Sequence, residues 1–210
     1  MIKTVATNTK DFFIKSYNEI LISEERIDLL MEIALTICNE LQLHKTVNLN
    51  FICIHNSRRS QLAQIWANYA TTFFNLNNIH CFSGGTIVTS FYRNTVKTLQ
   101  EVGFNFKILK FSHNNPYYSI SYKECPQPII AFSKLYNSDC INTPFIALTT
   151  CSSSNTKCPH ISDAIEQFYL PFTDPKNSDN SKLQAEKYLE VNKQIAGEMH
   201  YIFRLVKGNL

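Results

Sequence analysis

The sequence predicts an α/β protein with a doubly wound sheet of about four parallel strands and helices on both faces. Two compact apolar runs, Val47 to Cys53 and Phe145 to Thr150, have the length and composition of buried parallel strands. A period of 3.6 residues begins at Arg59, directly after the first run, and predicts a helix. Because strands alternate with helices, the chemistry of the sheet should lie beyond the carboxyl ends of the strands.

The 210 residues, of which 44% are hydrophobic, can form one sizeable domain or a smaller domain with extensions. An amphipathic helix is predicted from residue 23 to residue 41, with Ser23 as its N-terminal cap. This helix precedes the strand that ends at Cys53. We therefore divide the chain into a helical extension, residues 1–45, and an α/β domain, residues 46–210.

Two elements follow the helix that begins at Arg59. A second short strand, Ile79 to Phe82, is closed by the turn Ser83-Gly84-Gly85. A crossover helix over Thr95 to Val102 ends at Gly103.

An insertion separates these elements from the rest of the domain. We place it at about 111–134, as a β-hairpin with strands at Tyr117 to Tyr122 and Ile129 to Phe132. After the strand at Phe145, a last strand is predicted over Phe168 to Phe172. A long terminal helix from about Lys182 completes the fold.

The amino-acid composition limits the cellular compartments and the classes of partner that we expect. No stretch approaches the ~20 apolar residues that a membrane-spanning helix needs. The seven cysteines are an odd number, which argues against a secreted disulfide framework and favours a reducing, cytoplasmic compartment. Residues 51–160 carry nine Lys and Arg against three acidic residues, which favours small anions. Nucleic acid would also be attracted by this positive charge, and a solvated basic face accounts for the excess of Lys and Arg equally well. We expect neither nucleic acid nor a membrane as a partner.

The strongest signal lies between the first strand and the helix, where the chain reads Cys53-Ile54-His55-Asn56-Ser57-Arg58-Arg59-Ser60. Such a loop can turn successive backbone N–H groups inward, and the helix N-terminus adds positive charge, so that all of residues 54–59 can bind a tetrahedral oxyanion. Arg59 can hold two of its oxygens in a bidentate fork. The same field favours the thiolate of Cys53, to which Ser60 can donate a hydrogen bond. The alternative is an inert buried cysteine and a surface arginine.

A second pair of cysteines, Cys151 and Cys158, flanks a polar loop after the strand that begins at Phe145. A loop of this size lets the two sulfurs approach disulfide distance if it rearranges, which indicates redox chemistry. Two alternatives remain: the cysteines are unreactive, or they bind zinc together with His160. The spacing exceeds that of most zinc cysteines and no fourth ligand is evident, so we expect no metal.

The loop from Cys53 to Ser60, with the following Gln61-Leu62-Ala63, resembles the phosphate-binding loop of the low-molecular-weight protein tyrosine phosphatases and related arsenate reductases. The phosphatases usually have glycine where this chain has His55. A histidine at this position is associated more with the reductases. The resemblance covers roughly residues 47 to 207 and implies a flavodoxin-like fold. Thr173-Asp174-Pro175 resembles the family's Asp-Pro loop, in which Asp174 would be the general acid, although Asp-Pro is also a common turn.

In the thioredoxin-coupled arsenate reductases, a cysteine, six residues and Cys-Pro occupy the place of Cys151 and Cys158. The resemblance implies that Cys53 attacks arsenate, Cys151 attacks Cys53 and Cys158 resolves the disulfide. It further implies a thioredoxin-like reductant and no metal or organic cofactor. The alternatives are a phosphatase acting on phosphotyrosine or a small phosphomonoester through a phosphocysteine, and an anion-binding module without activity.

Overall fold

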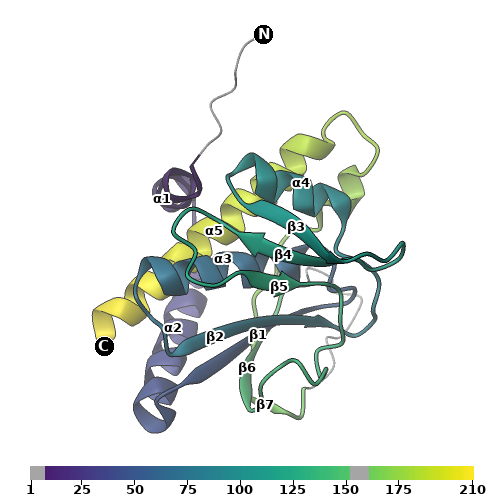
Figure 1. Ribbon diagram of the computed structural model, residues 1–210. Coiled ribbons are helices and arrows are strands. Elements are labelled where there is room, and N and C mark those ends of the chain that lie inside the picture. The colour runs from purple at the N-terminus through teal and green to yellow at the C-terminus, as the bar shows by residue number, and fades with distance from the viewer. Residues whose placement is uncertain (1–7, 152–160) are drawn as a thin grey trace.

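Four parallel strands form the central sheet, in the order β2-β1-β6-β7 (Figure 1). They are β1 (Val47–Cys53), β2 (Ile79–Gly85), β6 (Phe145–Thr149) and β7 (Ala164–Tyr169). The computed structural model describes residues 8–151 and 161–210. This parallel sheet with flanking helices confirms the predicted α/β fold class.

In the described ranges, five α-helices and one short 3₁₀ helix accompany the sheet. They are α1 (Thr9–Glu19), α2 (Glu24–His44), α3 (Arg59–Phe73), α4 (Arg93–Glu101), η1 (Pro175–Ser178) and α5 (Gln184–Asn209). The Ser23 hydroxyl accepts the Arg26 N–H, as expected of an N-terminal cap, and Lys45 ends α2 in a left-handed conformation. The sequence analysis did not predict α1, and α2 is longer than expected by about one turn.

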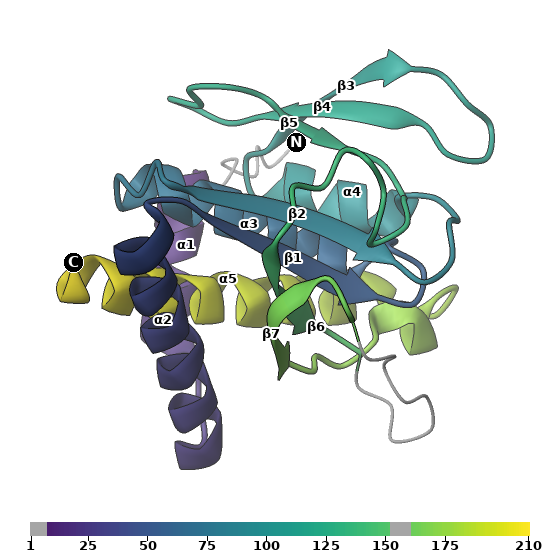
Figure 2. The same cartoon turned by 90° about the horizontal axis from the view of Figure 1, so that it is seen from below.

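The two faces of the sheet are covered less evenly than predicted. Along β1, Leu49 and Phe51 point into a large hydrophobic cluster to which each of the five α-helices contributes buried side chains. Ile52 points to the opposite face, into a smaller cluster with Ile141, Phe145 and neighbours from connecting segments. Helices α1 and α2 share the large cluster with the sheet, and both contact α5, which crosses the molecule in Figures 1 and 2.

A separate antiparallel sheet contains the predicted hairpin. Its strands are β3 (Asn105–Lys110), β4 (Tyr117–Ser121) and β5 (Ile129–Ala131), in the order β3-β4-β5. The β4–β5 pair confirms the hairpin, whereas β3 was not predicted. Figure 2 shows this small sheet as a layer apart from the central one. Gly85 links the two, because its N–H donates to the Lys134 carbonyl at 2.8 Å.

The last strand begins earlier than predicted. We expected Phe168 to Phe172, whereas β7 spans Ala164–Tyr169. At the edge of the sheet, the polar Glu166 is exposed, so the first half of the strand gives no apolar run in the sequence. Beyond Tyr169 the chain still follows β6, since the Leu170 N–H donates to the Thr149 carbonyl at 2.9 Å.

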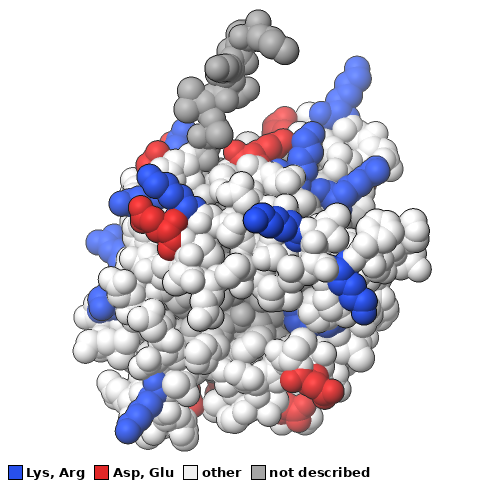
Figure 3. Space-filling model, viewed as in Figure 1, with Lys and Arg blue, Asp and Glu red and all other residues white. Residues whose placement is uncertain are grey.

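The surface carries both charges. On the face drawn in Figure 3, Lys and Arg are dispersed among Asp and Glu and uncharged residues, without one continuous basic patch. Of the helices in the described ranges, none combines the length and the apolar character that crossing a membrane requires.

Candidate active site

The loop after β1 lies where the sheet changes direction. Strand β1 is flanked by β2 on one side and β6 on the other, so the connections that leave β1 and β6 diverge. Strand β1 ends at Cys53, and α3 begins at Arg59. The predicted strand, loop and helix are therefore present with the predicted boundaries, and the loop lies at the switch point of the sheet.

The side chain of Asn56 supports this loop through hydrogen bonds. The residue is fully buried and adopts a left-handed conformation with φ of 44°. Its side-chain oxygen accepts the backbone N–H of Lys134 at 3.0 Å, which fixes the orientation of the amide. Its Nδ2 therefore points to Ser60 Oγ, at 2.9 Å. Gln61, from the first turn of α3, donates to both the carbonyl and the side-chain oxygen of Asn56.

The sulfur of Cys53 is approached by two hydrogen-bonding groups. The backbone N–H of Asn56 donates to Cys53 Sγ at 3.2 Å, and Ser60 Oγ lies 3.0 Å from the same atom. Because the Ser60 oxygen already accepts from Asn56, its proton is available to the sulfur. Two donors and the N-terminus of α3 all stabilise negative charge at this position.

The loop carbonyls point away from the cavity. The Ile54 carbonyl accepts the Ile87 N–H at 2.8 Å, and the His55 carbonyl accepts the hydroxyls of Ser133 and Thr89 at 2.9 and 3.0 Å. In a trans peptide the N–H points opposite to the carbonyl. The N–H groups of His55 and Asn56 therefore face the concave side of the loop, as an oxyanion-binding nest requires.

The loop encloses a cavity of about 200 Å³ together with the segment that follows β7. The cavity is lined by Cys53, Ile54, His55, Ser57, Arg58, Arg59, Asp174 and Lys176. The structure thus brings Asp174 to the loop that contains Cys53 and Arg59, from more than 100 residues away in the chain. Three of the lining side chains are basic and one is acidic, so the cavity suits an anion. Asn56 and Ser60, both fully buried, support the loop from outside the lining.

Arg59 connects the loop to Asp174. Its Nη2 donates to Asp174 Oδ2 at 2.6 Å, and its Nη1 donates to the Phe172 carbonyl at 3.1 Å. The other oxygen of Asp174 accepts a hydrogen bond from the backbone N–H of Lys176, so the Asp174 side chain caps the N-terminus of η1. An oxyanion held by Arg59 would therefore share this guanidinium with the Asp174 carboxylate.

Arg58 contacts a different carboxylate of the same segment. Its Nη2 donates to Asp179 Oδ2 at 2.7 Å and its Nε donates to the Tyr188 hydroxyl at 2.7 Å. The Tyr188 hydroxyl in turn donates to Asp179, and the ring of Tyr92 stacks against the guanidinium at 3.9 Å. Although Arg58 was predicted to bind the oxyanion and lines the cavity, these contacts make it a link between the loop, η1 and α5.

His55 is a partly buried residue in the lining of the cavity. Burial, with the charges of Lys176 and Arg58 nearby, lowers the pKa of His55 below its ordinary value. The imidazole is therefore neutral at neutral pH. Its Nδ1 is buried and has no hydrogen-bond partner among the described residues.

Cys151 leaves the sheet beside Cys53. Thr150 donates its backbone N–H and its hydroxyl to the Ile52 carbonyl, at 2.8 and 3.1 Å, so the residues that follow begin at the same edge of adjacent strands. Cys151 is 2% exposed and is not among the residues that line the cavity. Cys158 and His160 fall outside the described residues, so the resolving thiol and the zinc alternative remain predictions.

Sequence reasoning missed several residues that shape the loop, above all Gln61, Ser133 and Lys134. Gln61 is fully buried and also donates to the Phe132 carbonyl, so it joins the loop to the end of β5. A polar residue within the buried stripe of a helix was the available signal. Ser133 and Lys134 act from the segment predicted to be an insertion, and nothing in their local sequence indicates that contact.

Comparisons with known proteins add little to this geometry. No protein-family model matches the chain, and no curated protein matches it. Among solved structures, a thioredoxin-dependent arsenate reductase of Corynebacterium glutamicum is similar, with 15% identity and a TM-score of 0.44. The match covers 96% of this chain and 85% of that one. The case for a function therefore rests on the residues around Cys53.

Proposed function

We propose that this chain is an arsenate reductase of the low-molecular-weight tyrosine phosphatase superfamily, with Cys53 as its nucleophile. The observation that carries the proposal is the environment of the Cys53 sulfur. It lies 3.2 Å from the Asn56 N–H and 3.0 Å from the Ser60 hydroxyl, at the N-terminus of α3. Arg59 and Asp174 line the same cavity.

In the first step the Cys53 thiolate attacks the arsenic atom of arsenate. The inward N–H of His55 and the guanidinium of Arg59 stabilise the charge on the oxygens, while the Asn56 N–H stabilises the sulfur. Asp174, after taking up a proton from solvent, donates it to a hydroxyl group of arsenate. That group leaves as water as the sulfur–arsenic bond forms at Cys53.

In the second step the Cys151 thiolate attacks the Cys53 sulfur. A disulfide forms, the sulfur–arsenic bond breaks, and its electron pair remains on arsenic, which leaves as arsenite. Cys158 then attacks Cys151 and frees Cys53, and a thioredoxin-like dithiol reduces the Cys151–Cys158 disulfide. Two hydrogen bonds from Thr150 to the Ile52 carbonyl, each residue directly preceding one of the two cysteines, support this order of attack. The cycle requires no metal and no organic cofactor.

The second candidate is a phosphomonoesterase, and Asp174 is the observation that favours it. An ester leaving group needs a proton, and a carboxyl within the cavity can donate one. Phosphate and arsenate are nearly isosteric, so the loop accommodates both. Among the described residues no phenylalanine, tyrosine or tryptophan lines the cavity, and Lys176 follows the Asp-Pro pair, which weakens the case for a phosphotyrosine substrate.

The two candidates are separated by assaying one preparation of the full chain in two ways. Arsenate turnover is followed as NADPH oxidation in the presence of thioredoxin and thioredoxin reductase, and hydrolysis is followed with p-nitrophenyl phosphate. We expect arsenate turnover, and we expect Cys53→Ser to abolish both activities while Cys158→Ser abolishes only the reductase cycle. Cys140→Ser removes an exposed cysteine outside the cavity and should leave both unchanged.

Aryl phosphate hydrolysis that survives Cys158→Ser, without any arsenate turnover, would replace the reductase with the phosphomonoesterase. If neither phosphate nor sulfate binds, as measured by protection of Cys53 from alkylation, both candidates are wrong.

A further inference from the structure

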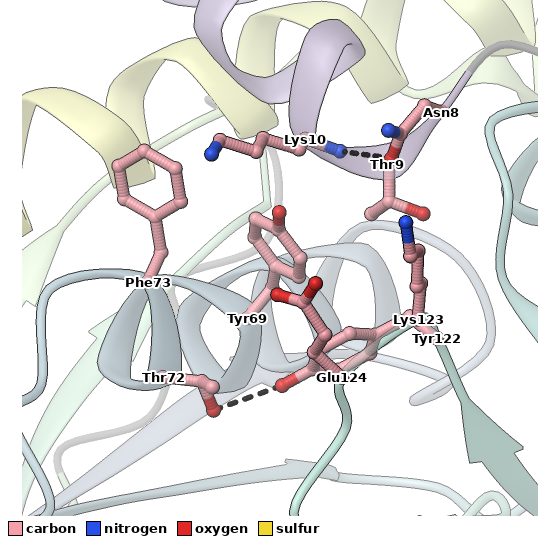
Figure 4. A pocket seen from close by; sticks show the side chains of 9 residues that line it. All are labelled: Asn8, Thr9, Lys10, Tyr69, Thr72, Phe73, Tyr122, Lys123 and Glu124. Atoms are coloured by element: carbon pink, nitrogen blue, oxygen red, sulfur yellow. Dashed lines mark hydrogen bonds between the residues drawn. The ribbon is translucent and has the colours of Figure 1, made fainter.

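A second cavity, of about 480 Å³, lies between the N-terminus of α1, the helix α3 and the turn after β4 (Figure 4). It shares no lining residue with the cavity at Cys53. Its walls include the rings of Tyr69, Phe73 and Tyr122, and the Tyr122 hydroxyl is fixed by a hydrogen bond of 2.8 Å to Thr72. Cavities of about 300–1,000 Å³ with aromatic walls and a few polar groups are typical of small-molecule sites.

The hydroxyl of Tyr69 points into this cavity (Figure 4). The residue is only 6% exposed, and its ring packs edge-on against Trp66, Phe104 and Tyr122. Among the described residues this hydroxyl makes no hydrogen bond, and it is not one of their fully enclosed polar atoms, so a ligand in the cavity can reach it. Burial, with Tyr122 and Glu124 nearby, raises the pKa of Tyr69, so the hydroxyl remains a donor at neutral pH.

Thr9 supplies a second hydroxyl at the same place. It is 4% exposed, stands at the first position of α1, and its side chain makes no hydrogen bond within the described part of the chain. In Figure 4 the ammonium group of Lys123 points toward it. The positive end of the α1 dipole and the Lys123 charge together favour a carboxylate at this end of the cavity.

The opposite charge comes from Glu124. Its carboxylate points toward the ring of Tyr69 in Figure 4, and neither Glu124 nor Lys123 forms a salt bridge with any described residue. The lining also contains Lys10, so its charged groups are two cations and one anion: the cations attract an anionic group, and Glu124 attracts an ammonium group. The cavity is thus complementary to a molecule that carries both charges and an apolar side chain.

We propose that this cavity binds a free amino acid as a zwitterion, with its carboxylate at Thr9 and Lys123, its ammonium group at Glu124 and its side chain against Phe73 and Tyr122. The Tyr69 hydroxyl donates to the ligand carboxylate. This site does not depend on the chemistry at Cys53, so its test is independent of the test of the function proposed above.

The test is calorimetric titration of the full chain with the standard L-amino acids, one at a time. We expect at least one to bind, and we expect its N-acetyl and its amide derivatives, which lack one charge each, to bind about tenfold more weakly or worse. Tyr69→Phe, Lys123→Met and Glu124→Gln should each weaken the free amino acid by a similar factor. Tyr118→Phe, a tyrosine of the small sheet outside the cavity, and Cys53→Ser should leave the affinity unchanged.

The proposal is wrong if no free amino acid binds, or if the three cavity variants bind as tightly as the unmodified chain. It is also wrong if the N-acetyl derivative binds as well as the free amino acid, because the site then recognises an anion and not a zwitterion. Lys123 lies on the surface, so its substitution reports on binding even where a core change such as Tyr69→Phe lowers stability.

Discussion

Gly85 lies so close to Ile54 that a Cβ atom added to Gly85 would be 2.7 Å from the Ile54 carbonyl oxygen. The same atom would be 2.8 Å from the backbone nitrogen of Asn56. Both neighbours belong to the backbone of the Cys53 loop, so neither can move without displacing the loop. The end of β2 therefore supports the loop through a contact that only glycine permits.

Gly85→Ala should consequently displace the loop and lower the free energy of unfolding by about 1–3 kcal/mol. It should also weaken phosphate or sulfate binding, because the inward N–H groups of the loop shift. Urea denaturation and anion protection of Cys53 measure the two effects. Gly208→Ala is the matched control, since a Cβ there meets nothing within 4 Å. Equal stability of the two variants would show that the loop tolerates the extra atom.

Arg58 should contribute to stability and to the placement of the Asp174 segment. Arg58→Met removes hydrogen bonds to Asp179 and Tyr188 and leaves a partly buried carboxylate without its cation, so unfolding should become easier by about 1–3 kcal/mol. Turnover at saturating substrate should fall because η1 loses its tie to the loop.

A double-mutant cycle with Asp179→Asn isolates the ion pair from the loss of the arginine itself. Arg93→Met, at an exposed position on α4, serves as the control and should be nearly neutral. A coupling free energy near zero between Arg58 and Asp179 would contradict the role assigned to this pair.

The elements that could be predicted are those whose signals are local. The apolar run to Cys53, the helical period from Arg59 and the cap at Ser23 each lie within a few neighbouring residues. Strand β3 could not be predicted, because its residues are largely exposed and it is defined by pairing with β4. Helix α1 was also missed, since Phe13 is buried against rings distant in the sequence, including Trp66 of α3 and His200 of α5.

In the candidate site too, features with a local sequence signal could be predicted and those that depend on distant residues could not. The proximity of Cys53, Arg59 and Asp174 could be predicted because each ends or follows a strand or begins a helix, and the fold brings such positions together. The partners of Arg58 were not found, because Asp179 and Tyr188 lie 121 and 130 residues away and leave no pattern near the arginine. Lys134 acts on the loop through its backbone N–H, which no side-chain motif reveals.

Asp174→Asn should change oxyanion binding and turnover in opposite directions. Its carboxylate lies 2.6 Å from Arg59 Nη2, so it competes with a bound anion for the guanidinium and repels it. Removing that charge should tighten phosphate binding by a few-fold. Removing the proton donor should lower turnover by about 10²-fold.

Equilibrium binding of phosphate and single-turnover kinetics measure the two effects in one preparation. Asp163→Asn, in the turn before β7 and outside the cavity, is the matched control. Weaker binding in Asp174→Asn would show that the carboxylate organises the site and does not oppose the anion.

His200 should make the fold less stable in mild acid. It packs against Phe13, Tyr17 and Phe74, and burial, with Arg204 nearby, lowers its pKa from 6.5 to about 4. At a pH between these two pKa values, His200 is protonated in the unfolded chain but not in the folded chain. The free energy of unfolding therefore falls as the pH falls. The slope from this group is at most about 1.4 kcal/mol per pH unit.

Urea midpoints measured across this range should therefore decline less in His200→Phe than in the unmodified chain. His55 contributes in the same direction in both proteins, so the difference between them reports on His200. The exposed His80, changed to glutamine, should leave the slope intact, and an unchanged slope in His200→Phe would mean that this imidazole is protonated alike in the folded and unfolded chain.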